Sequence, residues 1–199
     1  LGKTECWYIL DCPEGATLVV GHNAKDKEEC AKMIHEGRWS EFIREVPIRK
    51  GDFVSIVPGT VHAIKAGVML LETQQNSDIT YRVYDYDRLS NGRKRELHIE
   101  KSIDVINAPA SPAQDSIHNF ANVRKNKPVL MEKSAYYKVW KLVVEDGSEL
   151  QLSREKDFDS SYLLASVVAG SGYINDTAIK KGDHFIVTNE CDSLSFSGD

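Results

Sequence analysis

Short runs of β-branched and aromatic residues dominate the hydrophobic pattern of the chain, and glycine or proline residues separate them. The runs 5–10 and 16–20 lie on either side of Gly15, and the apolar run 68–74 follows Gly67. Both glycines therefore predict a β-hairpin. The pattern as a whole is typical of an all-β protein.

The period of the pattern becomes helical between Lys25 and Val46. Apolar residues recur three or four positions apart in this stretch, and Gly37 interrupts them. We predict two short helices, inserted between strands, whose apolar faces pack on a sheet. A further short helix is expected over residues 100–106.

The second half of the chain repeats a pattern of the first half in weaker form. Gly182-Asp183-His184-Phe185 matches the opening Gly51-Asp52-Phe53 of an earlier strand, without a later Pro-Gly turn and histidine. The stretch 107–113 holds two prolines among small residues, which cannot continue a helix or a central strand. The pattern therefore predicts a first domain at 1–108 with its helical insertion at about 25–46, a linker at 109–118, and a degenerate, metal-free second domain at 119–199.

Composition narrows the class of protein. The 199 residues hold 25 Lys and Arg against 30 Asp and Glu, a net charge of −5, so nothing indicates a surface for nucleic acid. No apolar run approaches the roughly 20 residues that a membrane helix requires. The cysteines lack the paired spacing of a zinc site, and the chain is too large to need disulfides, which favours reduced thiols and a cytoplasmic location.

One stretch carries a specific chemical signal, because an apolar run ends at Pro58-Gly59 and is followed by His62. A rigid turn sets a backbone path on which one imidazole can be aimed inward with a fixed orientation. The order resembles the second motif of the cupin superfamily of jelly-roll β-barrels, whose histidine usually binds a metal. Cupins generally keep a residue between the proline and the glycine. A hairpin with a partly buried histidine has the same pattern, so this stretch alone leaves both interpretations open.

A larger set of residues resembles the type I mannose-6-phosphate isomerases, within the cupin superfamily. The resemblance rests on Glu5 in Lys3-Thr4-Glu5, His62 after the Pro-Gly turn, Glu72 ten residues before Arg82, and the reading Tyr-Arg-Val-Tyr-Asp-Tyr-Asp-Arg at 81–88, which matches the short bacterial members. It covers residues 1 to about 108 closely and the remainder as the C-terminal cupin-like domain of that family. It implies two cupin-like jelly-roll barrels with a small helical insertion.

The resemblance also implies a metal-dependent aldose-ketose isomerase that interconverts mannose 6-phosphate and fructose 6-phosphate. Members bind one zinc through a glutamine, a histidine, a glutamate and a later histidine. Glu5 matches the glutamate and His62 the later histidine. Arg82 matches an arginine with a catalytic role, and Glu72 matches a glutamate proposed for proton transfer.

Two basic residues match the phosphate-binding side of the family. Lys3 matches a lysine that faces the sugar phosphate, and Arg88 stands where longer members carry a lysine. The change at Arg88 keeps the charge but replaces a point donor by a planar fork. A cluster of three basic residues at 93–95 is interpreted as a solvated loop and not as a phosphate site.

The remaining zinc ligands of the family lie in a Gln-x-His-Pro segment that precedes the Lys-x-Glu segment. The chain begins at Leu1 without a methionine and runs directly into a strand pattern, so we expect an N-terminally truncated piece of a longer protein. A stable zinc site generally takes three or four protein ligands, and Glu5 with His62 alone should bind zinc weakly. Whether the chain is active by itself stays open, as does the choice between monomer and homodimer.

Two other functions compete with this interpretation. A non-catalytic cupin module that binds a sugar or a sugar phosphate would share the fold without the full set of ligands. An iron-dependent cupin dioxygenase requires several histidines close together around the first motif, and none stands there besides His62. The sequence therefore favours the isomerase, with the binding module as the alternative.

Overall fold

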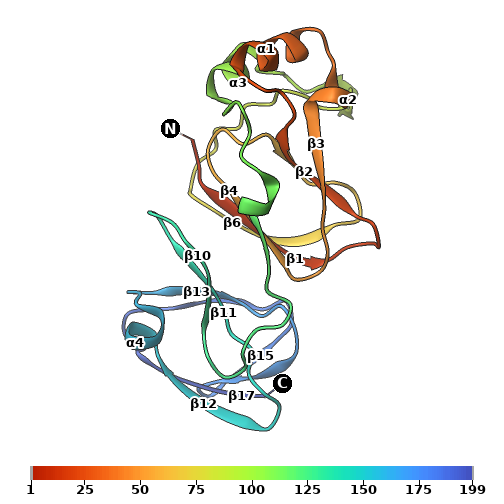
Figure 1. Cartoon of the computed structure of the whole chain (residues 1–199). Helices are drawn as coiled ribbons and strands as arrows, with labels where there is room; N and C mark the ends of the chain where they lie inside the picture. The colour runs from red at the N-terminus through yellow and green to blue at the C-terminus, as the bar shows by residue number, and fades with distance from the viewer. Residues whose placement is uncertain (1, 199) are drawn as a thin grey trace. The chain divides into compact units, whose positions relative to one another are not determined.

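The computed structural model describes residues 2–198 and divides them into two compact units, one up to Ala121 and one from Asn122. Both units consist mainly of short antiparallel strands, with few helices (Figure 1). The structure thus confirms the predicted all-β class. The two units are described separately.

The first unit contains a four-stranded antiparallel sheet of order β6-β1-β4-β9. Its strands are β1 (Glu5–Asp11), β4 (Asp52–Ile56), β6 (Met69–Gln74) and β9 (Ile117–Asn119). A second sheet of order β3-β2-β5 consists of β2 (Thr17–His22), β3 (Ile43–Pro47) and β5 (His62–Ala63). The stretch expected to be a linker, 109–118, therefore includes the 3-10 turn η1 (Ala113–Asp115) and ends inside β9, which pairs with β4.

Alternating side chains from both sheets form the core of the first unit. Its fully buried members are Trp7 and Ile9 from β1, Leu18 and Val20 from β2, and Val54 and Ile56 from β4. Burying a side chain of this size contributes roughly 1.5–3 kcal/mol relative to leaving it in water. The period of two in the sequence therefore fixes which face of β1 points inward, and Glu5 lies on that same face.

The hairpins predicted at Gly15 and Gly67 are wrong. β1 and β2 belong to different sheets, and so do β5 and β6. Each of the two turns carries the chain from one sheet to the other, while β1 takes its partners from the more distant β4 and β6. A turn residue marks a change of direction, and the local sequence does not tell whether the next strand pairs or crosses over.

The predicted helices form a separate cluster at one end of the first unit (Figure 1). They are α1 (Lys27–His35), α2 (Trp39–Phe42) and α3 (Ile99–Val105). The side chain of Asp26 caps α1 by accepting a 2.8 Å hydrogen bond from the backbone N–H of Glu29. The insertion is shorter than its helical spacing suggests, because residues 43–46 pair with β2 as part of β3.

A small hairpin follows the site residues predicted at 82–88. It consists of β7 (Leu89–Ser90) and β8 (Arg93–Lys94), joined by Asn91 and Gly92, which both have positive φ angles, 52° and 75°. Two successive residues with positive φ form the tight turn that two-residue hairpins favour. Arg95 directly follows β8, and its side chain donates a hydrogen bond to Asp85 in the loop before the hairpin.

The second unit contains a sheet of order β12-β17-β14-β15 and two strand pairs, β10-β11 and β13-β16. The bounds are β10 (Val129–Lys133), β11 (Lys138–Lys141), β12 (Ser148–Ser153), β13 (Leu163–Ser166), β14 (Ser171–Ile174), β15 (Thr177–Lys180), β16 (His184–Val187) and β17 (Ser193–Gly198), with the short helix α4 (Arg154–Phe158) after β12. Phe158, Ile174, Val187 and Leu194 form its buried core.

Candidate functional site

Glu5 and His62 meet in the first unit, although they come from different sheets. Glu5 opens β1 on the face that carries Trp7, and His62 opens β5 opposite Val20 of β2. The imidazole Nε2 of His62 lies 2.7 Å from Oε1 of Glu5. The Pro-Gly turn thus precedes the strand that carries this imidazole, and the partner of the imidazole is a carboxylate from the first strand.

Glu5 is a buried carboxylate whose second oxygen lacks a hydrogen bond. The residue is 1% exposed, and Oε2 receives no hydrogen bond from the described residues. Nζ of Lys3 forms an ion pair with Oε2, at 2.8 Å, and donates a hydrogen bond to Oε1 of Gln74. Burial raises the pKa of the Glu5 carboxyl, but the hydrogen bond from His62 and the ammonium of Lys3 outweigh it, so the pKa lies below its usual value.

His62 is held by groups on both ring nitrogens. Nδ1 donates a 2.8 Å hydrogen bond to the carbonyl of Thr60, and Nε2 faces the carboxylate of Glu5. Its ring also packs edge-on against Trp7, with 5.4 Å between the ring centroids. Burial lowers the pKa of His62, but the hydrogen bonds to Glu5 and Thr60 raise it above its usual value. The backbone carbonyl thus fixes the ring orientation and leaves Nε2 as the nitrogen directed at the site.

Glu72 lies on the same face of the sheet, two cross-strand pairs along from the pair that contains Glu5. In the register of β1 and β6, Glu5 pairs with Gln74 and Trp7 pairs with Glu72. The indole N–H of Trp7 donates a 2.8 Å hydrogen bond to Oε1 of Glu72. Trp7 is 2% exposed, so its N–H needs this partner, and the bond holds the carboxylate in one position.

Arg82 and Arg88 lie on the loop that follows β6. Arg82 donates through Nη1 to the carbonyl of Glu96, at 3.2 Å, and Arg88 forms a 2.7 Å ion pair with Asp85. Among the described residues, neither arginine makes a hydrogen bond or an ion pair with Glu5 or His62. The structure therefore brings Lys3, Glu5 and His62 into one cluster with Glu72 beside it, and holds both arginines on a separate loop.

Sequence reasoning missed three residues that position this cluster: Gln74, Trp7 and Thr60. Gln74 accepts from Lys3, Trp7 holds Glu72, and Thr60 orients His62. The period of two places Gln74 on the same face as Glu72, which is a signal that the sequence carries. The cross-strand register with Glu5 and Trp7 is a tertiary property, and no local pattern contains it.

The cluster fits two ligands of a metal ion. A buried carboxylate oxygen without a hydrogen bond and an imidazole with its other nitrogen bonded to a backbone carbonyl are typical of metal ligands. Within residues 2–198, however, no group of three or more His, Cys, Asp or Glu side chains is arranged to hold a metal. Glu5 and His62 therefore supply part of a coordination shell.

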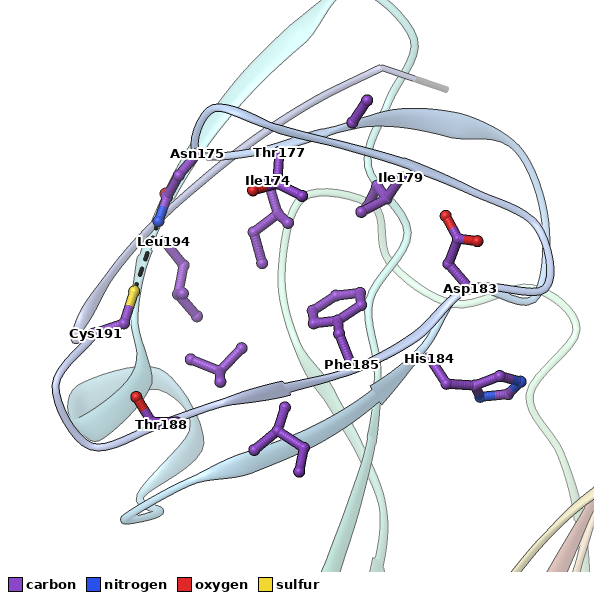
Figure 2. A pocket seen from close by; sticks show the side chains of 13 residues that line it. Ile174, Asn175, Thr177, Ile179, Asp183, His184, Phe185, Thr188, Cys191 and Leu194 are labelled. Carbon is purple, nitrogen blue, oxygen red and sulfur yellow. Dashed lines mark hydrogen bonds between the residues drawn. The ribbon is translucent and has the colours of Figure 1, made fainter.

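A cavity of about 370 Å³ lies in the second unit and differs in character from this cluster. Ile179, Phe185 and Leu194 line it, and the imidazole of His184 points away from its centre (Figure 2). Asp183 is the one carboxylate among its described lining residues. Apolar walls without converging charged groups do not suit a sugar phosphate, so the candidate site is in the first unit.

Comparisons with known proteins identify relatives of the whole chain. No family model matches the chain. A mannose-6-phosphate isomerase from Streptococcus mutans is 43% identical over 208 residues, which cover 100% of this chain and 62% of the relative. The crystal structure of the mannose 6-phosphate isomerase from Bacillus subtilis is 38% identical, with a TM-score of 0.85, over 100% of this chain and 62% of that one.

A more distant structure matches in fold. It is a mannose 6-phosphate isomerase bound with zinc and yttrium, 13% identical, with a TM-score of 0.67, and the match covers 98% of this chain and 64% of that one. The chain thus spans about three fifths of the length of the relatives it matches. These matches confirm the predicted fold of two cupin-like barrels with a small helical insertion, and the chain belongs to the mannose-6-phosphate isomerase family.

Proposed function

We propose that this chain carries part of the active site of a metal-dependent aldose-ketose isomerase that interconverts mannose 6-phosphate and fructose 6-phosphate. The observation that carries the proposal is the contact between the buried carboxylate of Glu5 and the imidazole of His62, 2.7 Å apart, in a chain that is 43% identical to a mannose-6-phosphate isomerase. The relatives are longer, so the proposal concerns the whole protein of which these residues form the site.

The reaction moves a carbonyl between carbon 1 and carbon 2 of a hexose phosphate. A proton must leave the carbon beside the carbonyl and return to its neighbour, through an enediol-like state. Glu72 suits this proton transfer, because Trp7 holds one of its carboxylate oxygens and leaves the other available. We assign Glu72 the role of moving the proton, and Arg82 the role of stabilising the negative charge that develops on oxygen.

Glu5 and His62 are the proposed metal ligands, and zinc is the proposed metal. When bound, a zinc ion supplies a Lewis acid that polarises the carbonyl oxygen. Glu5 offers Oε2, and His62 offers Nε2, with the orientation that Thr60 fixes. Two protein ligands are fewer than the three or four that a stable zinc site generally takes.

Lys3 and Arg88 are the proposed contacts of the substrate phosphate. Lys3 stands beside Glu5, and Arg88 presents a guanidinium at the surface of its loop. Both groups carry positive charge toward a dianionic phosphate. A hexose 6-phosphate is therefore the proposed partner, in a protein that acts as a monomer or a homodimer.

The proposed location is the cytoplasm. Cys12, Cys30 and Cys191 are free thiols, which is typical of reducing compartments. None of the helices described within residues 2–198 has the length and apolar character needed to cross a bilayer.

Elemental analysis and a coupled assay test the proposal together. We expect the purified 199-residue chain to hold well below one zinc per chain and to convert little mannose 6-phosphate, because Glu5 and His62 are two ligands where three or four are needed. A protein extended by a Gln-x-His segment upstream should hold one zinc and turn over.

Two results would overturn the proposal. An extended, zinc-loaded protein without turnover that still binds mannose 6-phosphate would favour the non-catalytic sugar phosphate module. Turnover that persists without metal would show that Glu5 and His62 serve another purpose.

A further inference from the structure

Asp85 is a buried carboxylate that holds two arginine side chains at once. It is 5% exposed, and its Oδ1 accepts a 2.7 Å hydrogen bond from Nη2 of Arg88. Nε of Arg95 donates to Oδ2 at 2.8 Å, and Nη2 of Arg95 also donates to Oδ1. The guanidiniums of Arg95 and Arg88 hold the pKa of the Asp85 carboxyl well below its usual range, although burial opposes them.

The arrangement leaves donors of both arginines unused. Nη1 of Arg88 and Nη1 of Arg95 make no hydrogen bond to any described residue. A concave space of about 210 Å³ lies between them, lined by Arg88, Leu89, Ser90 and Arg95. Ser90 of β7 is a third polar residue that lines this space, between Arg88 in the loop before the hairpin and Arg95 directly after β8.

The net charge of Arg88, Arg95 and Asp85 favours an anion as the ligand. Two guanidiniums and one carboxylate leave one net positive charge, and the neighbouring Arg93 adds another. Lys94 is neutralised locally by Asp87, at 2.5 Å. Guanidinium forks match the geometry of phosphate oxygens and bind them through two parallel hydrogen bonds. The volume exceeds the roughly 30 Å³ of one water molecule and admits a phosphate group.

We propose that Arg95 and Arg88 together bind the phosphate group of a phosphate monoester, and that Asp85 is the positioning residue that holds both guanidiniums toward it. This inference rests on the proposed function for the identity of the ester as a hexose 6-phosphate. It revises the interpretation of residues 93–95 as a solvated loop, because Arg95 is tied to Asp85 while Arg93 stays at the surface.

Titration of the chain with ligands tests the proposal directly. Inorganic phosphate, mannose 6-phosphate and unphosphorylated mannose would be added to the 199-residue chain, and affinity measured by calorimetry and by the NMR signals of the arginine Nε–H groups. We expect both phosphate compounds to bind and to shift the signals of Arg88 and Arg95, and mannose to leave them unchanged. Arg95→Gln should weaken phosphate binding by about tenfold or more, the usual effect of losing a charged hydrogen bond.

Arg93→Gln is the matched control, because it removes the same charge from the same hairpin without touching Asp85. We expect a change of less than about twofold for it. Arg95→Lys retains the charge and loses the fork, so it should also weaken binding, by severalfold, at an unchanged unfolding midpoint. Asp85→Asn should weaken binding although both arginines remain.

Two results would overturn the inference: equal losses in Arg93→Gln and Arg95→Gln, which would indicate a general charge effect, or full phosphate binding in Arg95→Gln. Its failure is distinguishable from failure of the proposed function, because phosphate binding needs neither zinc nor turnover. In the extended enzyme, Arg95→Gln should raise KM for mannose 6-phosphate more than it lowers kcat. Turnover with an unchanged KM would refute the phosphate contact and leave the isomerase proposal intact.

Discussion

His62 and Glu5 form a contact across two sheets, with Nε2 of the imidazole 2.7 Å from Oε1 of the carboxylate. β5 and β1 share no strand pairing, so this side-chain contact joins the β3-β2-β5 sheet to the β6-β1-β4-β9 sheet at the site. The pair therefore has a consequence for metal binding that can be measured.

Removing the charge of Glu5 should weaken zinc binding. Glu5→Gln keeps the size of the side chain but offers a neutral amide in place of a buried carboxylate, and His62 is then left as a single ligand. We expect the zinc affinity, measured by competition with a chromogenic chelator, to fall at least about tenfold. His35→Gln is the control, since His35 is an exposed histidine whose partner is Glu100. Equal zinc binding in the Glu5→Gln variant and the parent would remove Glu5 from the metal site.

The hydrogen bond between Trp7 and Glu72 should be visible in the stability of the first unit. Trp7→Phe removes the hydrogen-bond donor to the exposed carboxylate of Glu72 and also removes part of a core side chain that is 2% exposed. We expect the free energy of unfolding, from urea titration, to fall by about 1–3 kcal/mol.

The same substitution at Trp39 provides the comparison. The indole of Trp39 stacks on Tyr84, with 4.5 Å between centroids, and its N–H has no hydrogen-bond partner among the described residues. Phe can keep much of the stacking, so Trp39→Phe should cost less than Trp7→Phe. The reverse order would argue against the Trp7–Glu72 bond as a stabilising contact.

Much of the local structure could be predicted from the sequence. The change of period near Lys25 and the interruption at Gly37 correctly predicted two short helices, and the apolar runs around them became strands. Strand pairing could not be predicted, as Gly15 and Gly67 illustrate. Both turns carry the chain between sheets, and that choice depends on contacts between β1, β4 and β6 that are far apart in sequence.

Some residues of the candidate site could also be predicted from the sequence, and their contacts could not. His62 could be identified because a rigid turn precedes it, and Glu5 through the family resemblance. Nothing local indicated that Gln74 would accept from Lys3, or that Asp85 would bind Arg95 from the far side of a hairpin. Those contacts arise from cross-strand register and from the turn at Asn91, which returns the chain to the loop it has just left.

His22 should make the first unit less stable in mildly acidic solution. Burial lowers the pKa of its imidazole, despite the hydrogen bond that Nε2 donates to the carbonyl of Asn107, at 2.9 Å. Nδ1 already accepts a hydrogen bond from the backbone N–H of Ala24, at 3.2 Å. Protonation of Nδ1 would therefore place two N–H donors facing each other. The unfolded pKa is about 6.5, and the folded pKa is lower.

The sign of the effect follows from these two values. Because the unfolded state takes up the proton first, the contribution of His22 is fully present above about pH 6.5 and is lost as the pH falls below it. We expect the difference in unfolding free energy between the parent and His22→Gln to shrink between about pH 7 and pH 5. A difference that stays constant over this range would show that His22 does not titrate on unfolding.

A side chain at Gly51 should lower the stability of the first unit for two reasons: its backbone angle and the close approach of Ala121. Its φ is 88°, and a Cβ there would lie 2.7 Å from Cα and 2.8 Å from N of Ala121. Gly15 also has a positive φ, 71°, but nothing lies within 4 Å of the position its Cβ would take. Gly15→Ala should therefore cost only the conformational penalty, about 1–2 kcal/mol.

Gly51→Ala should cost that penalty and a backbone displacement as well, about 1–3 kcal/mol more. The backbone cannot move away freely, because the N–H of Gly51 donates to the carbonyl of Ile9, at 2.9 Å, and its own carbonyl accepts from the N–H of Phe120, at 2.7 Å. Urea unfolding of both variants measures the difference. If the two alanines cost the same, the close approach of Ala121 to Gly51 does not constrain the end of the first unit.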